Sequence, residues 1–178
     1  VTSTYLLEYL PKTTHIINNP SAIRNYSEKI FPFSFKKYMP PTIVSQDIEV
    51  IKNFLLKYKD IITKPLYGNG GDGIFRSKLN EGVLNGIDYN QRILKEPLLA
   101  QKYIPEIKEG DRRIILIDGD YVGSVARIPK LNNIKANFHA GGTAKQTSLV
   151  RRDGEICDML KDTLKKENLF FVGIDIIG

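Results

Sequence analysis

The sequence predicts a fold that mixes helices and strands, because apolar patterns typical of strands and amphipathic helical patterns both occur along its 178 residues. Two features predict hairpins: a glycine-rich segment interrupts the apolar stretch 61–79, and Asp118-Gly119 joins two further apolar runs. A third feature predicts a helix, since apolar residues recur at helical spacing between Ile48 and Tyr58. The length is sufficient for one large domain or for two small lobes with a buried core.

The first half of the chain carries recognisable start signals for each element. Ser21 is placed to cap a helix that runs to about Phe31. A short strand is predicted at 42–44, after two consecutive prolines. Ser45 is then predicted to cap the amphipathic helix, which ends near Lys59.

The second half begins with a weaker helical pattern at 89–95 and a strand at 98–104. The Asp118-Gly119 hairpin follows, so we interpret Asp118 as a turn residue and not as an acid catalyst. Residues 129–145 show no periodic pattern, and a loop of that length inside a compact domain is usually a functional lid or disordered.

The last helix and the last strand have clear apolar patterns. Ile156, Leu160 and Leu164 form the predicted buried stripe of the helix. The run 169–177 is apolar except for one aspartate, so we expect a strand buried on both faces. Because such strands rarely finish a protein and the chain does not begin with methionine, we expect a fragment of a longer polypeptide.

The net charge of +6 and the isoelectric point near 9.3 raise the question of nucleic-acid binding. The basic residues form separate pairs instead of one tract, so anionic small molecules suit this charge better than nucleic acid. No apolar run is long enough to span a bilayer, and no signal peptide is recognisable, so we expect no membrane partner. The single cysteine, Cys157, fits a reducing compartment, and cytoplasm is the default expectation.

The glycine-rich segment that follows Lys64 is the strongest local signal. Gly68, Gly70 and Gly73 satisfy the spacing G-x-G-x-x-G, but a dinucleotide fingerprint would open a helix here. An apolar, extended run follows instead, and a P-loop is excluded because Gly73 is followed by Ile74 and Phe75 and not by Lys and Ser/Thr. We therefore predict a hairpin whose backbone N–H groups cover nucleotide phosphates. A surface hairpin whose glycines serve only turn geometry is the alternative.

Five blocks in this order resemble prokaryotic glutathione synthetase, a member of the ATP-grasp superfamily. They are KPLYGNGGDGIFR, QKYIPEIKEGDRRIILIDG, VARIP, NFHAGGT and FVGIDIIG, within a similarity that runs from about Asn18 to Gly178. The resemblance implies an ATP-grasp fold of the α+β class, with two lobes that clasp the nucleotide, incomplete at both ends. It divides the chain into the end of a preceding domain or linker (1–20), a lobe with the glycine hairpin (21–104) and a truncated second lobe (105–178) with the lid 129–145.

The activity that the resemblance implies is the ATP-dependent joining of γ-glutamylcysteine to glycine through an acyl phosphate, with Mg²⁺ or alternatively Mn²⁺. Phosphorylating a carboxylate and then expelling phosphate both concentrate negative charge, so lysine, arginine and metal ions are the groups required. The alternatives are another ATP-grasp carboxylate-amine ligase, or a fragment that binds nucleotide without turnover. A homo-oligomer is compatible with the resemblance, which implies no nucleic-acid partner.

The resemblance also implies a set of nucleotide-binding residues. Two lysines would hold phosphates, the hairpin glycines would cover them, the segment between the lobes would read adenine, and an aspartate would take the ribose. These residues are Lys29, Lys64, Gly68, Gly70, Gly71, Gly73, Gln101, Tyr103, Ile104 and Asp111. Each has a simpler alternative: Lys29 at a helix end favours the macrodipole, and Tyr103 with Ile104 is an ordinary end of a core strand.

The catalytic residues implied are Arg113 and Arg127, near the transferred phosphate and the dipeptide carboxylate. Surface salt bridges are their alternative role. Arg127, Lys135 and Asn137 would bind substrate, and Lys135 stands where the family commonly has arginine. Asp175 would bind the metal, because a carboxylate among apolar neighbours is costly unless it finds a cation or firm hydrogen bonds, and magnesium would supply the cation. The family's remaining metal ligands follow beyond the end of this sequence.

Overall fold

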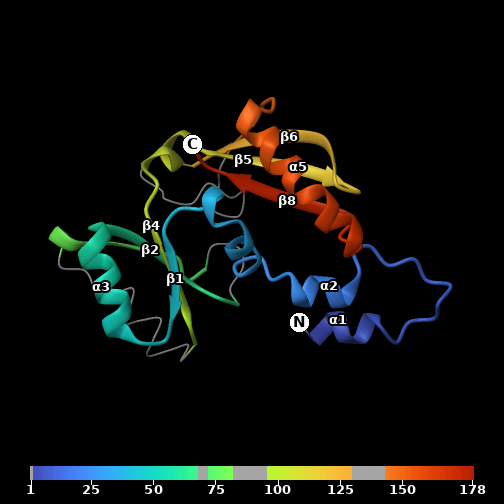
Figure 1. The fold of residues 1–178 in the computed structure, drawn as a ribbon, viewed down its shortest axis with the longest axis horizontal. Coiled ribbons are helices and arrows are strands. Elements are labelled where there is room, and N and C mark those ends of the chain that lie inside the picture. The colour runs from blue at the N-terminus through green and yellow to red at the C-terminus, as the bar shows by residue number, and fades with distance from the viewer. Residues whose placement is uncertain (1, 68–71, 82–95, 130–142) are drawn as a thin grey trace. The chain divides into compact units, whose positions relative to one another are not determined.

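The structure is a computed structural model that describes residues 2–67, 72–81, 96–129 and 143–178 (Figure 1). It contains two compact units, each described here by itself. The hairpin unit comprises residues 32–109 and 129–143, and the β8 unit comprises residues 1–31, 110–128 and 144–178. The chain passes from the β8 unit to the hairpin unit after residue 31 and returns after residue 109, whereas the predicted lobe with the hairpin begins at residue 21 and ends at residue 104. The division into two functional lobes stays a prediction.

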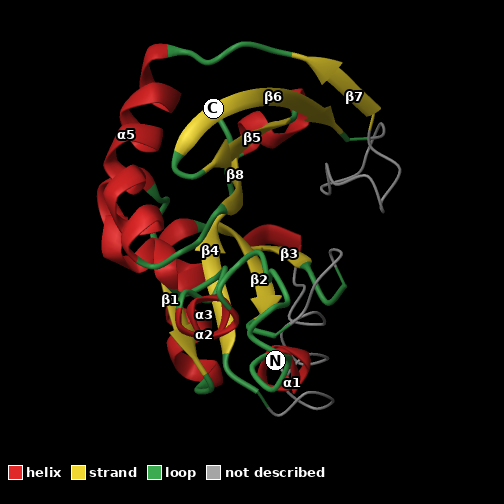
Figure 2. Cartoon of the chain, turned by 90° about the vertical axis from the view of Figure 1, so that its right-hand side faces the viewer, coloured by secondary structure: helices red, strands yellow, loops and turns green. Residues whose placement is uncertain are grey.

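The hairpin unit is built on a four-stranded antiparallel sheet with the order β1-β4-β2-β3 (Figure 2). The strands are β1 (Thr42–Ser45), β2 (Asp60–Pro65), β3 (Phe75–Lys78) and β4 (Leu98–Lys102). β2 and β3 pair from Asp60 opposite Lys78 to Thr63 opposite Phe75, which confirms the predicted hairpin around the glycines. The predicted strand 98–104 is found as β4 but ends two residues earlier.

Helix α3 (Ile48–Tyr58) packs on one face of this sheet, around a core that includes Ile51, Leu55 and Leu98. The prediction that Ser45 caps the helix is wrong. Asp47 is the cap, since its carboxylate accepts the backbone N–H of Glu49 at 2.8 Å. The Ser45 hydroxyl accepts the Asp47 N–H at 2.9 Å, because Ser45 still belongs to β1 and lies one step before the turn into the helix.

The β8 unit is built on a second four-stranded sheet with the order β7-β6-β5-β8 (Figure 2). Its strands are β5 (Asp111–Ile117), β6 (Asp120–Ile128), β7 (Thr143–Gln146) and β8 (Phe171–Ile176). Asp118 has φ 48° and Gly119 has φ 73°, so both residues of the β5–β6 turn lie in the left-handed region, as the Asp-Gly signal predicts. Helix α5 (Arg151–Lys166) packs on this sheet and buries the predicted stripe Ile156, Leu160 and Leu164.

Two predictions for the β8 unit are wrong. β8 is a strand, but it lies at the edge of the sheet and Phe171 is exposed, so it is not buried on both faces. The end of the predicted loop 129–145 forms β7, whose four residues are all exposed. An edge strand with no buried face carries no alternation of apolar and polar residues, so no pattern in the sequence predicted β7.

The amino-terminal segment folds into α1 (Thr2–Leu7) and α2 (Pro20–Asn25). The predicted helix from Ser21 to Phe31 is therefore too long, and its cap is Asn19, whose side chain accepts two backbone N–H groups. Ile23 and Ile30 are both exposed, so no core contact extends the helix beyond its second turn.

The remaining described segments are short turns of 3₁₀ helix: η1 (Phe31–Tyr38), η2 (Leu79–Glu81) and η3 (Pro105–Glu109). The predicted helix 89–95 lies outside the described residues. Across the part of the chain that is described, no helix combines the length and the apolarity needed to cross a membrane.

Candidate functional site

The predicted site residues fall into two clusters, one in each unit. In the hairpin unit, Lys64 Nζ donates a hydrogen bond to Gln101 Oε1 at 3.2 Å. Gln101 Nε2 in turn donates to Thr42 Oγ1 at 2.9 Å, so the amide of Gln101 is held on both sides. The structure thus joins two of the predicted nucleotide-binding residues and adds Thr42, which the sequence analysis did not single out.

Strand register explains why these side chains meet. Ile61, Thr63 and Pro65 of β2 are buried, so Lys64 projects from the opposite face of the strand. Across the β2–β4 ladder, Lys64 lies opposite Leu99 and Ile62 lies opposite Gln101. Gln101 is two residues beyond Leu99, so Lys64 and Gln101 are diagonal neighbours on the same face. A long amine and a short amide can bridge that diagonal.

The same face of the hairpin unit holds a second group, which the sequence analysis missed. Arg76 Nε donates to Asp60 Oδ1 at 2.9 Å, and Arg76 Nη2 donates to Asp60 Oδ2 at 2.6 Å. The guanidinium carbon of Arg76 lies 3.5 Å from the centre of the Tyr103 ring. The alternation of side chains along β2 could have revealed this group, because Asp60, Ile62 and Lys64 lie on one face and Arg76 on β3 is directly opposite Ile62.

The other predicted nucleotide-binding residues are only partly described. Gly73 has φ 69°, a conformation that favours glycine, which agrees with its position at the hairpin. Tyr103 is buried and its backbone N–H donates to Asp60 O at 3.0 Å, immediately before Ile104. Lys29 belongs to the β8 unit, where its Nζ lies 3.5 Å from Glu28 Oε1. The residues Gly68, Gly70, Gly71, Lys135 and Asn137 lie outside the described residues.

In the β8 unit, four predicted site residues form one ion-pair cluster. Arg127 binds the Asp111 carboxylate with both arms, through Nε at 2.7 Å and Nη2 at 2.5 Å. Arg127 Nη2 also lies 2.8 Å from Asp175 Oδ2. Arg113 binds Asp175 with both arms as well, with Nη2 at 2.7 Å from Oδ2. We call Asp111, Arg127, Asp175 and Arg113 the four-residue cluster.

Register and two glycines assemble the four-residue cluster. Asp111 is directly opposite Arg127 across the β5–β6 ladder, and Arg113 is directly opposite Asp175 across the β5–β8 ladder. The Arg113 side chain lies across Gly173, where an added Cβ would be 3.0 Å from its Cδ. Gly110 has φ +109°, and an added Cβ there would be 2.6 Å from the Arg127 carbonyl oxygen.

Opposite charges stabilise the ionised forms of Asp175 and Arg127. Burial opposes the charge on Asp175, but hydrogen bonds and the charges of Arg113 and Arg127 outweigh it and lower the pKa of Asp175 below its ordinary value. Burial likewise opposes the charge on Arg127, and the two carboxylates more than compensate, so the pKa of Arg127 is raised. Two carboxylates and two guanidiniums balance in formal charge, and they can exchange partners with an incoming anion.

We tested whether these residues fit the predicted metal. Both oxygens of Asp175 are hydrogen-bonded to guanidinium groups, and Asp111 is bound by Arg127. In the ranges that the structure describes, no three side chains of the types His, Cys, Asp and Glu come together as a metal site. One carboxylate held by two cations does not fit Mg²⁺ by itself, so the metal-binding role of Asp175 stays a prediction.

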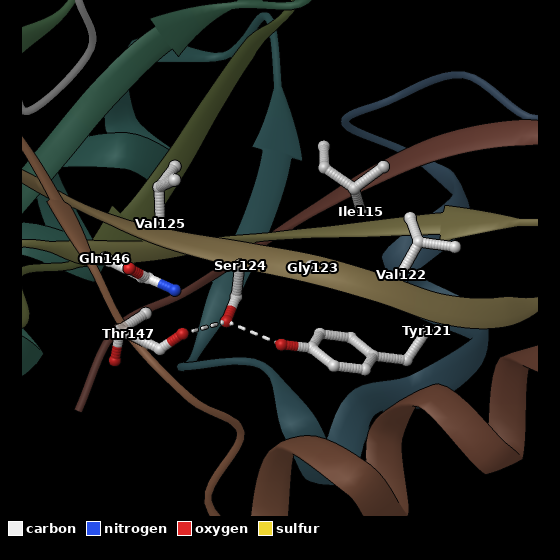
Figure 3. A pocket seen from close by; sticks show the side chains of 8 residues that line it. All are labelled: Ile115, Tyr121, Val122, Gly123, Ser124, Val125, Gln146 and Thr147. Carbon is white, nitrogen blue, oxygen red and sulfur yellow. Dashed lines mark hydrogen bonds between the residues drawn. The ribbon is translucent and has the colours of Figure 1, made fainter.

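A cavity of about 520 Å³ lies beside β5 and β6 in the β8 unit (Figure 3). It is lined by Ile115, Tyr121–Val125, Gln146 and Thr147. Ser124 Oγ donates to the Thr147 carbonyl at 2.9 Å and shares a hydrogen bond of 3.1 Å with the Tyr121 hydroxyl (Figure 3). Because its lining includes no lysine, arginine or carboxylate, this cavity does not suit a triphosphate.

Comparison with solved structures defines the class of fold. A crystal structure of D-cycloserine synthetase superposes with a TM-score of 0.71 at 14% identity, over 98% of this chain and 65% of that chain. A complex of an ATP-grasp ligase with a precursor peptide and AMPPNP superposes with a TM-score of 0.67 at 18% identity, over 99% of this chain and 54% of that chain. The predicted ATP-grasp fold of the α+β class is confirmed.

Sequence comparison then defines the family. Residues 28–178 match the family described as prokaryotic glutathione synthetase, ATP-grasp domain. Glutathione synthetase from Agrobacterium fabrum is 41% identical over 179 aligned residues, which cover all of this chain and 56% of the relative. The chain therefore belongs to the prokaryotic glutathione synthetase family, as its sequence blocks predicted. It spans about half the length of the curated relatives that it matches.

Proposed function

We propose that this chain is the nucleotide-binding and substrate-closing part of an ATP-dependent ligase that forms glutathione from γ-glutamylcysteine and glycine. Membership of the family supports the activity. The observation that carries the proposal is the hydrogen bond from Lys64 to Gln101, which joins the strand leading into the glycine hairpin to the strand leading into the predicted adenine segment. The proposed location is cytoplasmic, and the proposed partners are these small molecules.

The hairpin unit supplies the proposed ATP site. Lys64 is anchored by Gln101 on the face of the sheet that α3 leaves uncovered, so its charge is held in one position before a phosphate arrives. The backbone N–H groups of the glycine hairpin would cover the phosphates, and Tyr103 with Ile104 would contact adenine. A preorganised cation of this kind stabilises charge on a transferring phosphoryl group without reorganising during the reaction.

The β8 unit supplies the proposed residues that handle the reacting carboxylate and phosphate. Arg113 and Arg127 present planar guanidiniums that match either anion with paired hydrogen bonds. Asp111 and Asp175 now hold both guanidiniums by hydrogen bonds, and an incoming anion would take over part of these hydrogen bonds. Asp111 would hydrogen-bond the ribose, and Lys135 and Asn137 would bind substrate from the lid.

The amide-forming activity is tested with a polypeptide of the relatives' length that contains this chain. We expect ADP and phosphate to be released only when γ-glutamylcysteine and glycine are both present, because the acyl phosphate needs one substrate to form and the other to be consumed. Release with a different acid and amine would instead support another ATP-grasp ligase. Both substrates are added singly as controls.

The ATP site is tested on the chain itself by calorimetry with MgATP. Removing an anchored phosphate contact by Lys64→Ala should weaken binding at least tenfold, about the value of a charge-assisted hydrogen bond. Lys52→Ala is the matched control, because Lys52 is on α3 and pairs with Glu49 on the helix surface. Equal heats for the wild-type chain and Lys64→Ala would remove Lys64 from the site.

A second candidate function is a nucleotide-binding module without turnover. The observation that favours it is the poor fit of the four-residue cluster to Mg²⁺, since the described residues provide no group of three carboxylate, histidine or cysteine ligands. It predicts that the 178-residue chain binds ATP but releases no phosphate with both substrates present. Phosphate release by the chain alone would exclude this candidate.

A further inference from the structure

We propose that Arg76 is a positioning residue that fixes the predicted adenine segment and couples it to the glycine hairpin, without touching the nucleotide itself. This inference rests on the proposed function. Arg76 is on β3, directly after the glycine hairpin, whereas Tyr103 follows β4 and lies within the predicted adenine segment, residues 101–104. The guanidinium of Arg76 spans these two places within one unit.

The first contact that carries the proposal is the stack of Arg76 on Tyr103. A separation of 3.5 Å between the guanidinium carbon and the ring centre is direct face contact between two flat groups. Tyr103 is only 5% exposed, so the guanidinium covers a ring that is otherwise enclosed by protein. A ring covered in this way cannot change its rotamer unless Arg76 moves first, and Ile104 follows it directly along the chain.

The second contact is the fork between Arg76 and Asp60. Two parallel hydrogen bonds of 2.9 and 2.6 Å fix the plane of the guanidinium, which a single bond would leave free to rotate. Asp60 also accepts the backbone N–H of Tyr103 through its own carbonyl at 3.0 Å. Asp60 therefore holds Tyr103 twice, once directly through the backbone and once through the side chain of Arg76.

The consequence is a mechanical link between the phosphate and base ends of the proposed site. Asp60 and Lys64 lie on one face of β2, Arg76 is on β3, and the segment between these strands carries the glycines. A shift of β3 would tilt the guanidinium and release the Tyr103 ring. Arg76 would therefore affect the binding of the base, while the phosphate contact of Lys64 would remain intact.

The experiment compares ATP with inorganic triphosphate as calorimetric probes of the 178-residue chain. Arg76→Lys keeps the charge but loses the fork and the flat stack, and we expect it to weaken ATP binding about tenfold, while triphosphate binding changes by less than about twofold. Asp60→Asn, which leaves the shape unchanged, should give the same selective loss. Arg152→Lys, which changes an exposed arginine of α5, is the matched control and should alter neither ATP binding nor triphosphate binding.

Each outcome decides between the proposals. If the wild-type chain binds ATP and Arg76→Lys binds it equally well, the role of Arg76 is overturned and the proposed function stands. Equal losses for ATP and triphosphate would also overturn it, because they would indicate a general structural effect. A wild-type chain that binds neither probe overturns the proposed function together with this inference. Should Arg76→Lys fail to fold, Asp60→Asn provides the same test.

Discussion

The buried ion pair between Asp111 and Arg127 provides the sharpest test of the energetics of the β8 unit. The side chains are 10% and 7% exposed, and two short hydrogen bonds join them. Replacing Arg127 by methionine keeps most of the packing volume but leaves the Asp111 carboxylate buried and unpaired. Removing one partner of a buried pair costs about 3–5 kcal/mol, so we expect Arg127→Met to lower the free energy of unfolding by that amount.

A double-mutant cycle separates the free-energy cost of losing the ion pair from the cost of leaving the Asp111 carboxylate buried without a partner. Adding Asp111→Asn to Arg127→Met removes that charge, so the double variant should lose only about 1–2 kcal/mol, measured by urea unfolding of the 178-residue chain. Arg151→Met is the matched control: its side chain is 94% exposed and its pair with Glu155 on α5 should contribute less than about 0.5 kcal/mol. Additive losses within about 0.5 kcal/mol would refute the reasoning, because independent sites add and a coupled pair does not.

Four further predictions concern single positions. Gly110→Ala should lower the thermal midpoint, since its Cβ would meet the Arg127 carbonyl oxygen at 2.6 Å and its φ of +109° is strained, a cost of at least about 1–3 kcal/mol. Thr63→Val should be neutral or stabilising in urea, because the buried Thr63 hydroxyl has no hydrogen-bond partner in the described structure. Cys157 should resist iodoacetamide at pH 7 until the chain is unfolded, as burial and neighbouring carboxylates raise its thiol pKa. Asp175 has a lowered pKa in the folded state, so its contribution to the free energy of unfolding should be present above about pH 4 and disappear as the pH falls further. Asp175→Asn should flatten the acid part of a plot of unfolding free energy against pH, and an unchanged plot would contradict the assignment.

Local signals in the sequence were sufficient for most elements of the fold. The Asp118-Gly119 turn was predicted because both of its residues favour positive φ, and helix α5 because its apolar residues repeat at helical spacing. β7 could not be predicted, since every residue of this edge strand is exposed. The cap of α3 was misplaced by two residues because Ser45 and Asp47 are both good caps, and only the end of β1 decides between them.

The sequence alone determined which residue types are available: a lysine before a glycine hairpin, separated arginines, and a lone carboxylate in an apolar run. It also determined the family, through blocks whose order is specific. The tertiary structure decided which of these residues meet. Asp111, Arg113, Arg127 and Asp175 form one cluster because β8 pairs with β5 across more than fifty intervening residues. Strand register over such a distance is fixed by which side chains pack on the covered face of the sheet, and no local pattern contains it.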